Sequence, residues 1–157
     1  MNTRKRGVRL LQCPWLFLAI AGVAGCGSGL KLYPVHGKVV YPDGSPMKGG
    51  AVIFEPVDSS VKVSARGYID NEDGTFALTT VKAGDGAPAG PYRVMVRGKV
   101  IPHGRGADPE AIKTWEPQVH PRFQDFKTSG LEFTVEPKNN EFVITVEKPS
   151  GSRTPQR

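Results

Sequence analysis

The sequence contains only two cysteines, Cys13 and Cys26, so at most one disulfide could form. Its mostly apolar, uncharged stretch, residues 14–25, is shorter than the roughly 20 residues that a membrane-spanning helix needs. No segment shows a sustained helical period of apolar residues. These absences argue against a disulfide-stapled domain, a membrane-spanning helix and a helical protein.

The N-terminal segment has the organisation of a secretory signal, because four basic residues precede the apolar stretch. They are Arg4, Lys5, Arg6 and Arg9. The stretch ends in Val23-Ala24-Gly25-Cys26, which resembles the lipobox of bacterial lipoproteins. The resemblance implies that residues 1–25 are removed as a signal peptide and that Cys26 receives a lipid. The alternative is an ordinary secretory signal with a cysteine at its end by chance.

Lipidation of Cys26 would anchor the protein to a membrane of the cell envelope. Gly27 follows in place of the Asp that is associated with inner-membrane retention in some bacteria, so the outer membrane is preferred. Cys13 would be lost with the signal, which leaves no disulfide in the mature chain. Such a chain must hold its fold by core packing alone.

Removal of the signal also changes the charge balance. The full chain carries +6, but residues 26–157 contain 17 basic and 15 acidic residues, a net charge of +2. The mature chain keeps no basic cluster apart from Arg153 and Arg157 in its tail. Binding to nucleic acid is therefore not expected.

The mature chain is long enough for one domain. We expect a lipidated tether over residues 26–34, a folded domain over 35–147 and a disordered polar tail over 148–157. Apolar and polar residues alternate with period two through most of the folded region, which is typical of half-buried strands. The expected strands are residues 35–41, 51–55, 61–69, 75–79, 92–97, 131–136 and 142–146.

Turn-forming residues separate these strands. Pro42-Asp43-Gly44 and Asn71-Glu72-Asp73-Gly74 each predict a tight turn, and Pro137-Lys138-Asn139-Asn140 predicts a hairpin between the last two strands. The pattern predicts an all-β fold, a seven-stranded antiparallel β-sandwich. Residues 98–130 show no alternation and form a long loop with at most one short helix, expected over 109–115. Trp115, Phe123 and Phe126 are expected to pin this loop to the sandwich.

Three segments resemble carboxypeptidase regulatory-like domains, which have a transthyretin-like fold. Residues 35–47 (VHGKVVYPDGSPM) resemble their first strand and turn, residues 73–78 (DGTFAL) a later strand, and residues 89–96 (AGPYRVMV) the strand after it. Motifs at residues 120–123, 128–131 and 140–142 resemble a variant of small bacterial lipoproteins. The resemblance implies a cell-envelope location and no catalytic residue.

The sequence offers little for catalysis or metal binding. His36, His103 and His120 lack the close spacing of a zinc site, and Ser64 and Ser129 lack the Gly-x-Ser-x-Gly motif of hydrolases. The acidic residues before Gly74 fail the spacing of a calcium loop. We therefore expect no catalytic residue, no metal site and no cofactor.

The preferred interpretation is a lipid-anchored, non-catalytic binding module for a protein or glycan of the envelope. A possible partner surface is formed by Lys62, Arg66, Tyr68, Arg93 and Arg97, since Arg and Tyr are frequent interface anchors. A plain solvated sheet face is the competing interpretation, and pairing at an edge strand is a related one. The alternative function is an enzyme, or an accessory subunit of an envelope hydrolase, with a site in the 98–130 loop. The sequence leaves the oligomeric state open.

Overall fold

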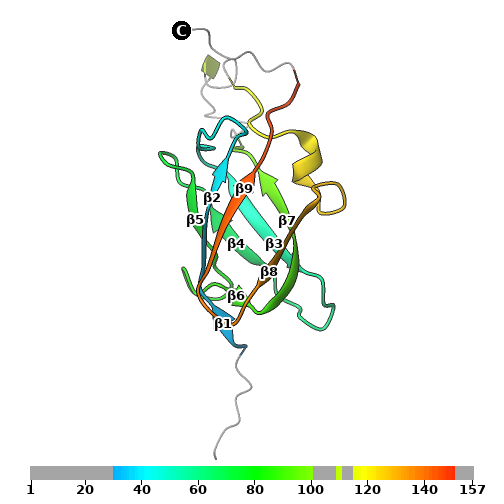
Figure 1. Ribbon diagram of the computed structural model, residues 1–157. Coiled ribbons are helices and arrows are strands. Elements are labelled where there is room, and N and C mark those ends of the chain that lie inside the picture. The colour runs from blue at the N-terminus through cyan, green and yellow to red at the C-terminus, as the bar shows by residue number, and fades with distance from the viewer. Residues whose placement is uncertain (1–29, 101–108, 111–114, 151–157) are drawn as a thin grey trace, which may run out of the picture.

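The computed structural model describes residues 30–100, 109, 110 and 115–150. These residues are mostly β-structure, arranged as two larger sheets and one short ribbon (Figure 1). One sheet has the order β5 (Thr75–Ala77), β2 (Val35–Val40), β9 (Asn140–Thr145). The other has the order β4 (Ala65–Tyr68), β3 (Ala51–Pro56), β7 (Gly90–Arg97), β8 (Leu131–Val135). The ribbon pairs β1 (Leu32–Tyr33) with β6 (Ala87–Pro88).

An aromatic cluster joins the two larger sheets and forms the centre of the core. The ring of Phe54 on β3 lies 5.9 Å from Tyr92 and 6.0 Å from Phe133, both in its own sheet. It lies 6.5 Å from Phe76 and 6.1 Å from Phe142, which belong to the other sheet. These centroid distances fall in the range of favourable aromatic pairs, so the two sheets pack face to face as a sandwich.

Gly37 is required in β2 because the core closes over its backbone. A Cβ atom at this position would lie 2.6 Å from Cζ of Phe76 and would also meet the carbonyl oxygen of Phe142. Phe76 therefore occupies the space in which any other residue would carry its side chain. The glycine lets β2 lie at the middle of its sheet beneath a large ring.

All seven expected strands are present, with one clearly shortened. The alternation over 61–69 predicted a nine-residue strand, but only Ala65–Tyr68 pairs with β3. Residues 58–61 instead form a turn, in which the amide of Val61 donates to the carbonyl of Asp58. The facing part of β3 ends at Pro56, which has no amide hydrogen to donate to a ladder.

The prediction of a wholly antiparallel sandwich is wrong, because β2 and β9 are parallel. Val35 pairs with Asn140 and Val40 with Thr145 in the same direction. The predicted hairpin after residue 136 is also wrong, because β8 lies in the four-stranded sheet and β9 in the other one. The chain crosses between sheets at this point, and both strands remain at sheet edges (Figure 1).

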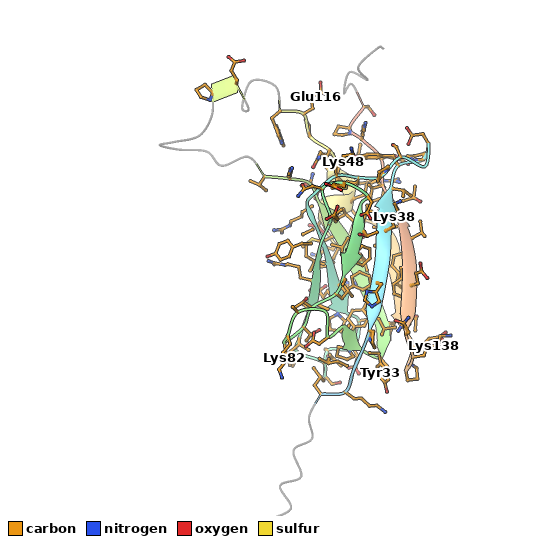
Figure 2. The ribbon with its side chains drawn as sticks, turned by 90° about the vertical axis from the view of Figure 1, so that its left-hand side faces the viewer. Tyr33, Lys38, Lys48, Lys82, Glu116 and Lys138 are labelled. Atoms are coloured by element: carbon orange, nitrogen blue, oxygen red, sulfur yellow. The ribbon has the colours of Figure 1, made fainter. Side chains whose placement is uncertain are left out.

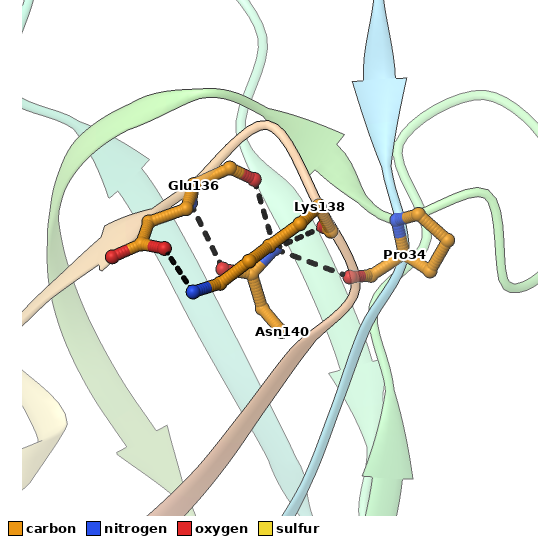
Figure 3. A network of polar contacts seen from close by, with 4 residues as sticks. All are labelled: Pro34, Glu136, Lys138 and Asn140. Atoms are coloured by element: carbon orange, nitrogen blue, oxygen red, sulfur yellow. Dashed lines mark hydrogen bonds and ion pairs between the residues drawn. The ribbon is translucent and has the colours of Figure 1, made fainter.

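Asn140 holds this crossover together, and its side chain is buried (Figure 3). Its Oδ1 accepts from the amide of Glu136 at 2.9 Å. Its Nδ2 donates to the carbonyls of Lys138 at 2.7 Å, Glu136 at 3.0 Å and Pro34 at 3.4 Å. One amide group thus ties the crossover to the segment that leads into β2.

Both predicted tight turns are present. The amide of Gly44 donates to the carbonyl of Tyr41 at 2.9 Å, and Oδ1 of Asp43 accepts from the amide of Ser45. In the second turn Gly74 adopts a φ of 75°, a value that residues with a Cβ atom rarely adopt. The turn chemistry was therefore readable from the residues themselves.

The long loop differs from its prediction. Of the expected helix over 109–115, Pro109 and Glu110 are helical, Trp115 is not, and residues 111–114 lie outside the described part. An unexpected 3₁₀-helix, η1 (Pro121–Gln124), packs against β7. His120 caps it, with Nδ1 accepting from the amide of Arg122, and Phe123 is buried. Of the three expected pins, Phe123 is buried, Phe126 is half-buried and Trp115 is exposed.

The described fold begins within the expected tether. Leu32 and Tyr33 form β1 and pair with Pro88 and Ala87. At the other end, residues 151–157 of the predicted tail lie outside the described residues, as do residues 1–29 with Cys26.

Candidate functional site

The outer face of the four-stranded sheet carries the largest group of predicted surface residues. In β3, Phe54 points into the core, so Ile53 points outward. The pairing register places Ile53 between Arg66 of β4 and Met95 of β7. One step along the strands, Ala51 lies between Tyr68 and Arg97. Period-two alternation therefore brings Arg66, Tyr68, Arg93 and Arg97 onto one face.

Lys62, the fifth predicted residue, does not belong to this sheet face. It lies in the connection between β3 and β4, outside both strands. Its charge acts on Asp58: the amide and hydroxyl of Ser60 hold the pKa of the Asp58 carboxyl below its usual value, and Lys62 adds to this effect. The strand predicted from residue 61 begins only at Ala65, which explains the separation.

One half of the face has its charge neutralised. Arg93 forms an ion pair with Glu55 at 3.7 Å and lies opposite Glu132 of β8 in the register. Its Nε is buried without a hydrogen-bond partner. Arg93 is thus flanked by carboxylates on both neighbouring strands, which leaves little net charge for a partner.

The other half combines cations with exposed apolar groups. Arg66 and Arg97 are exposed, and Tyr68 is 75% exposed. After β7 the chain continues over this end of the face as Lys99 and Val100, and Val100 is 81% exposed. We call Arg66, Tyr68, Arg97, Lys99 and Val100 the distal patch.

The distal patch surrounds a shallow hollow of about 260 Å³ whose floor includes Ala51 and Ile53. Ile53 is only 7% exposed although it faces outward, so the side chains around it cover most of its surface. A second hollow, of about 520 Å³, also borders Ile53, Arg66 and Tyr68 and is lined in addition by Thr79 and Thr80. Arg66 and Tyr68 thus border both depressions.

Gln118 fixes the segment that carries Lys99 and Val100. Its Oε1 accepts from the amide of Lys99 at 2.8 Å, and its Nε2 donates to the carbonyl of Lys48 at 2.9 Å. A further hollow of about 200 Å³ lies behind this segment and is lined by Val100, Trp115 and Gln118. Sequence reasoning did not select Lys99, Val100 or Gln118, because no local pattern links residue 118 to residues 48 and 99.

The residue 98–100 segment of the distal patch and the start of the fold lie at opposite ends of the molecule. β7 runs toward the end at which the loop with η1 lies, away from β1 (Figure 1). Tyr33 of β1 lies at one end, and Lys48 and Glu116 lie at the other (Figure 2). Gln118, which contacts Lys48, therefore places the residue 98–100 segment at the end far from β1.

The two described histidines cannot share a metal ion. His36 pairs with Glu141 at the start of β9, whereas the amide of His120 donates to the carbonyl of Glu147 beyond its end. Six residues of extended chain separate these partners, a span of about 20 Å. His103 lies outside the described residues. Within the described ranges, no group of three or more His, Cys, Asp or Glu side chains is placed to hold a metal.

The connection between β5 and β6 is ordered by Asp85. Its carboxylate accepts from the amides of Thr80, Val81 and Lys82 at 2.6–2.9 Å. Partial desolvation raises the pKa of this carboxyl, but the amide hydrogen bonds outweigh it and the pKa lies below its usual value. The hydroxyl of Thr80 also donates to the carbonyl of Gly86 at 2.6 Å.

Comparison with known proteins gives no match to a protein-family model, to a curated protein or to a solved structure. Among the helical residues that the structure describes, none belongs to a helix of the length and apolarity needed to cross a membrane.

Proposed function

We propose that this chain is a lipid-anchored protein of the bacterial cell envelope whose sandwich is a non-catalytic binding module. In this proposal residues 1–25 are a signal peptide, Cys26 carries the lipid, and the outer membrane is the preferred location. The partner, a protein or a glycan of the envelope, binds to the outer face of the four-stranded sheet. The observation that carries this proposal is the gathering of Arg66, Tyr68 and Arg97 around one hollow.

Several properties of this face support binding. Arg and Tyr contribute strongly to interfaces because each combines a large contact area with directional hydrogen bonds. Here they surround an apolar floor at Ile53 and sit on a rigid sheet, so little conformational entropy is lost when a partner binds. A simple solvated face would not require this combination.

The position of the face also suits an anchored protein. The described chain enters the fold at β1, and Lys48, which Gln118 links to Lys99 of the distal patch, lies at the opposite end (Figure 2). A lipid on Cys26, six residues before Leu32, would hold the β1 end near the membrane. The distal patch would then point away from the lipid surface, toward other envelope components.

We further propose that the sandwich is a carboxypeptidase regulatory-like domain with a transthyretin-like arrangement. This proposal rests on the order of the motifs in residues 35–47, 73–78 and 89–96. Their strands, β2, β5 and β7, appear in that order, with the expected turns between them. A solved structure of this chain, compared strand by strand with that family, tests the assignment.

Metabolic labelling with a palmitate analogue tests the anchor. The wild-type chain should incorporate label and fractionate with membranes, and Cys26→Ala should abolish both. Cys13→Ala should lose neither, because Cys13 lies in the segment that is removed. Labelling that persists in Cys26→Ala would refute the lipid anchor.

Site-specific photocrosslinking in intact cells tests the binding face. A photoreactive residue at position 68 should give a discrete crosslinked species. One at position 143 is the matched control, because Val143 is also exposed, at 63%, but lies on β9 of the other sheet. Equal crosslinking from both positions, or none from position 68, would contradict the proposed face.

A further inference from the structure

We propose that the distal patch binds a polysaccharide that bears carboxylate groups, such as a polyuronate. This inference rests on the proposed function, because it assumes that the outer face is a binding surface, and it names the chemistry of the ligand. Four features of the described residues carry it: cations without a carboxylate partner, an exposed aromatic ring, adjoining hollows and the lack of a free strand edge at Arg66.

The first feature is a charge imbalance within one sheet face. The outward-facing strand residues in this sheet include two acids, Glu55 and Glu132, and both flank Arg93. Arg66 and Arg97 have no carboxylate across from them in the register, where they face Ile53 and Ala51. Lys99 adds a third positive charge next to them. A ligand with repeated carboxylates complements this half of the face.

The acidic residue nearest to Arg66 in sequence, Asp70, is engaged in its own turn. Its Oδ1 accepts from the amide of Glu72 at 2.7 Å, and its backbone amide donates to Thr75. Among the described residues, Arg93 pairs with Glu55 and Arg122 with Glu147, whereas the guanidinium groups of Arg66 and Arg97 form no ion pair. A guanidinium binds a carboxylate through two parallel hydrogen bonds, which favours a ligand with planar acids.

The second and third features concern shape. Tyr68 is 75% exposed and borders two shallow hollows, one lined by Lys99 and Val100 and the other by Thr79 and Thr80. The C–H face of a pyranose ring stacks on such an aromatic ring, and neighbouring units would enter the hollows. The cations on either side would reach the carboxylates of those units.

The fourth feature disfavours an acidic peptide that adds as a strand. β3 and β7 are interior strands and have no free edge. β4 is the outer strand, but the amide and carbonyl of Arg66 already exchange two hydrogen bonds with Thr79, at 2.9 and 2.8 Å. The main-chain pairing that gives extended peptides their affinity is therefore blocked at Arg66.

The test measures binding of sodium polygalacturonate to the purified full-length protein in detergent micelles, by titration calorimetry. The controls are dextran, a neutral glycan, and polyglutamate, an acidic peptide of similar length. We expect binding to polygalacturonate, at least tenfold weaker binding to polyglutamate, and none to dextran.

Three patch variants and two control variants assign the binding to the patch. The double variant Arg66→Gln/Arg97→Gln should weaken binding at least tenfold, because each lost charged hydrogen bond contributes about 1.5 kcal/mol or more. Tyr68→Ala should weaken it about fivefold or more, and Tyr68→Phe should retain it. Lys99→Gln should weaken binding, whereas its matched control, Lys38→Gln on β2 of the other sheet, should not.

The outcomes separate this inference from the proposed function. Absence of binding to polygalacturonate, equal binding to polyglutamate, or an unchanged affinity in Tyr68→Ala would each overturn the glycan inference. If position 68 nevertheless gives a crosslinked species in cells, the binding face stands and its partner has another chemistry. Unaltered unfolding curves of the exposed-site variants verify that the losses are not caused by misfolding.

Discussion

Replacement of Asn140 by Ala should destabilise the fold by about 3 kcal/mol, because one side chain holds the crossover between the two sheets. Asn140 is 5% exposed and makes three hydrogen bonds of 2.7 to 3.0 Å, to the amide and carbonyl of Glu136 and the carbonyl of Lys138. Each contributes about 1 kcal/mol, and the longer contact with Pro34, at 3.4 Å, adds little. The loss is therefore a large part of the stability of a domain this size.

The assay is urea unfolding followed by tryptophan or tyrosine fluorescence, with linear extrapolation to water. The matched control is Asn139→Ala, since Asn139 is adjacent in the same turn but exposed. It should change the free energy of unfolding by less than about 0.5 kcal/mol. Asn140→Asp separates the two sides of the network, because it keeps an acceptor for the Glu136 amide but loses the Nδ2 donor. It should be at least as destabilising as Asn140→Ala at neutral pH and should partly recover when acid protonates the carboxyl.

A loss below about 1 kcal/mol in Asn140→Ala would refute this reasoning. So would an equal loss in Asn139→Ala. Either result would mean that pairing of β9 with β2, and not the side-chain network, determines the course of the crossover.

Three further predictions concern the core and the Asp85 loop. Gly37→Ala should lower the melting temperature by at least about 8 °C, because the Cβ of the introduced alanine would collide with the Phe76 ring. An unchanged melting temperature in calorimetry would contradict the close approach of Phe76 to the backbone of residue 37. Tyr92→Phe should cost about 1 kcal/mol in urea unfolding at neutral pH, because it removes the 2.9 Å hydrogen bond to the Pro88 carbonyl. Burial raises the pKa of Tyr92 to about 12, so the contribution of its neutral hydroxyl to the free energy of unfolding should be complete below pH 10. This contribution should decline between pH 10 and 12, and Tyr92→Phe should reduce that decline. Asp85→Ala should speed hydrogen exchange at the amides of Val81 and Lys82, which donate to its carboxylate. In the wild type, protection of these amides should fall as acid protonates the Asp85 carboxyl, at a pH below its usual pKa. Unchanged exchange in Asp85→Ala would show that the loop does not depend on Asp85.

The distal patch shows how part of a surface can be read from sequence and part cannot. Arg66 and Tyr68 are two residues apart in one strand, and Arg93 and Arg97 are four apart in another, so alternation alone placed each pair on one face. That both pairs share the same face depends on the register between β4, β3 and β7. The division of the face into a neutralised and a cationic half depends on the same register.

The long loop shows a second limit. Asp108-Pro109-Glu110 carries the local signals of a helix start, and Pro109 and Glu110 are helical. The unexpected helical turn, η1, depends on the capping of the Arg122 amide by His120 and on burial of Phe123 beside β7. Capping by a histidine side chain has a weaker sequence signal than capping by Ser, Thr or Asp, and burial of one phenylalanine has none.

The sequence by itself determined the properties that depend on near neighbours: the strands, from their period of two, the tight turns, from Asp, Asn and Gly, and the outward direction of Arg66 and Tyr68. Only the tertiary structure decided which sheet each strand joins, that β2 and β9 run parallel, and that Lys99 and Gln118 lie beside Lys48 and the patch. The physical reason is that alternation specifies which side of a strand is buried but carries no information about its partner. Partners are selected by contacts between distant residues, such as the Phe54 cluster and the hydrogen bonds of Asn140.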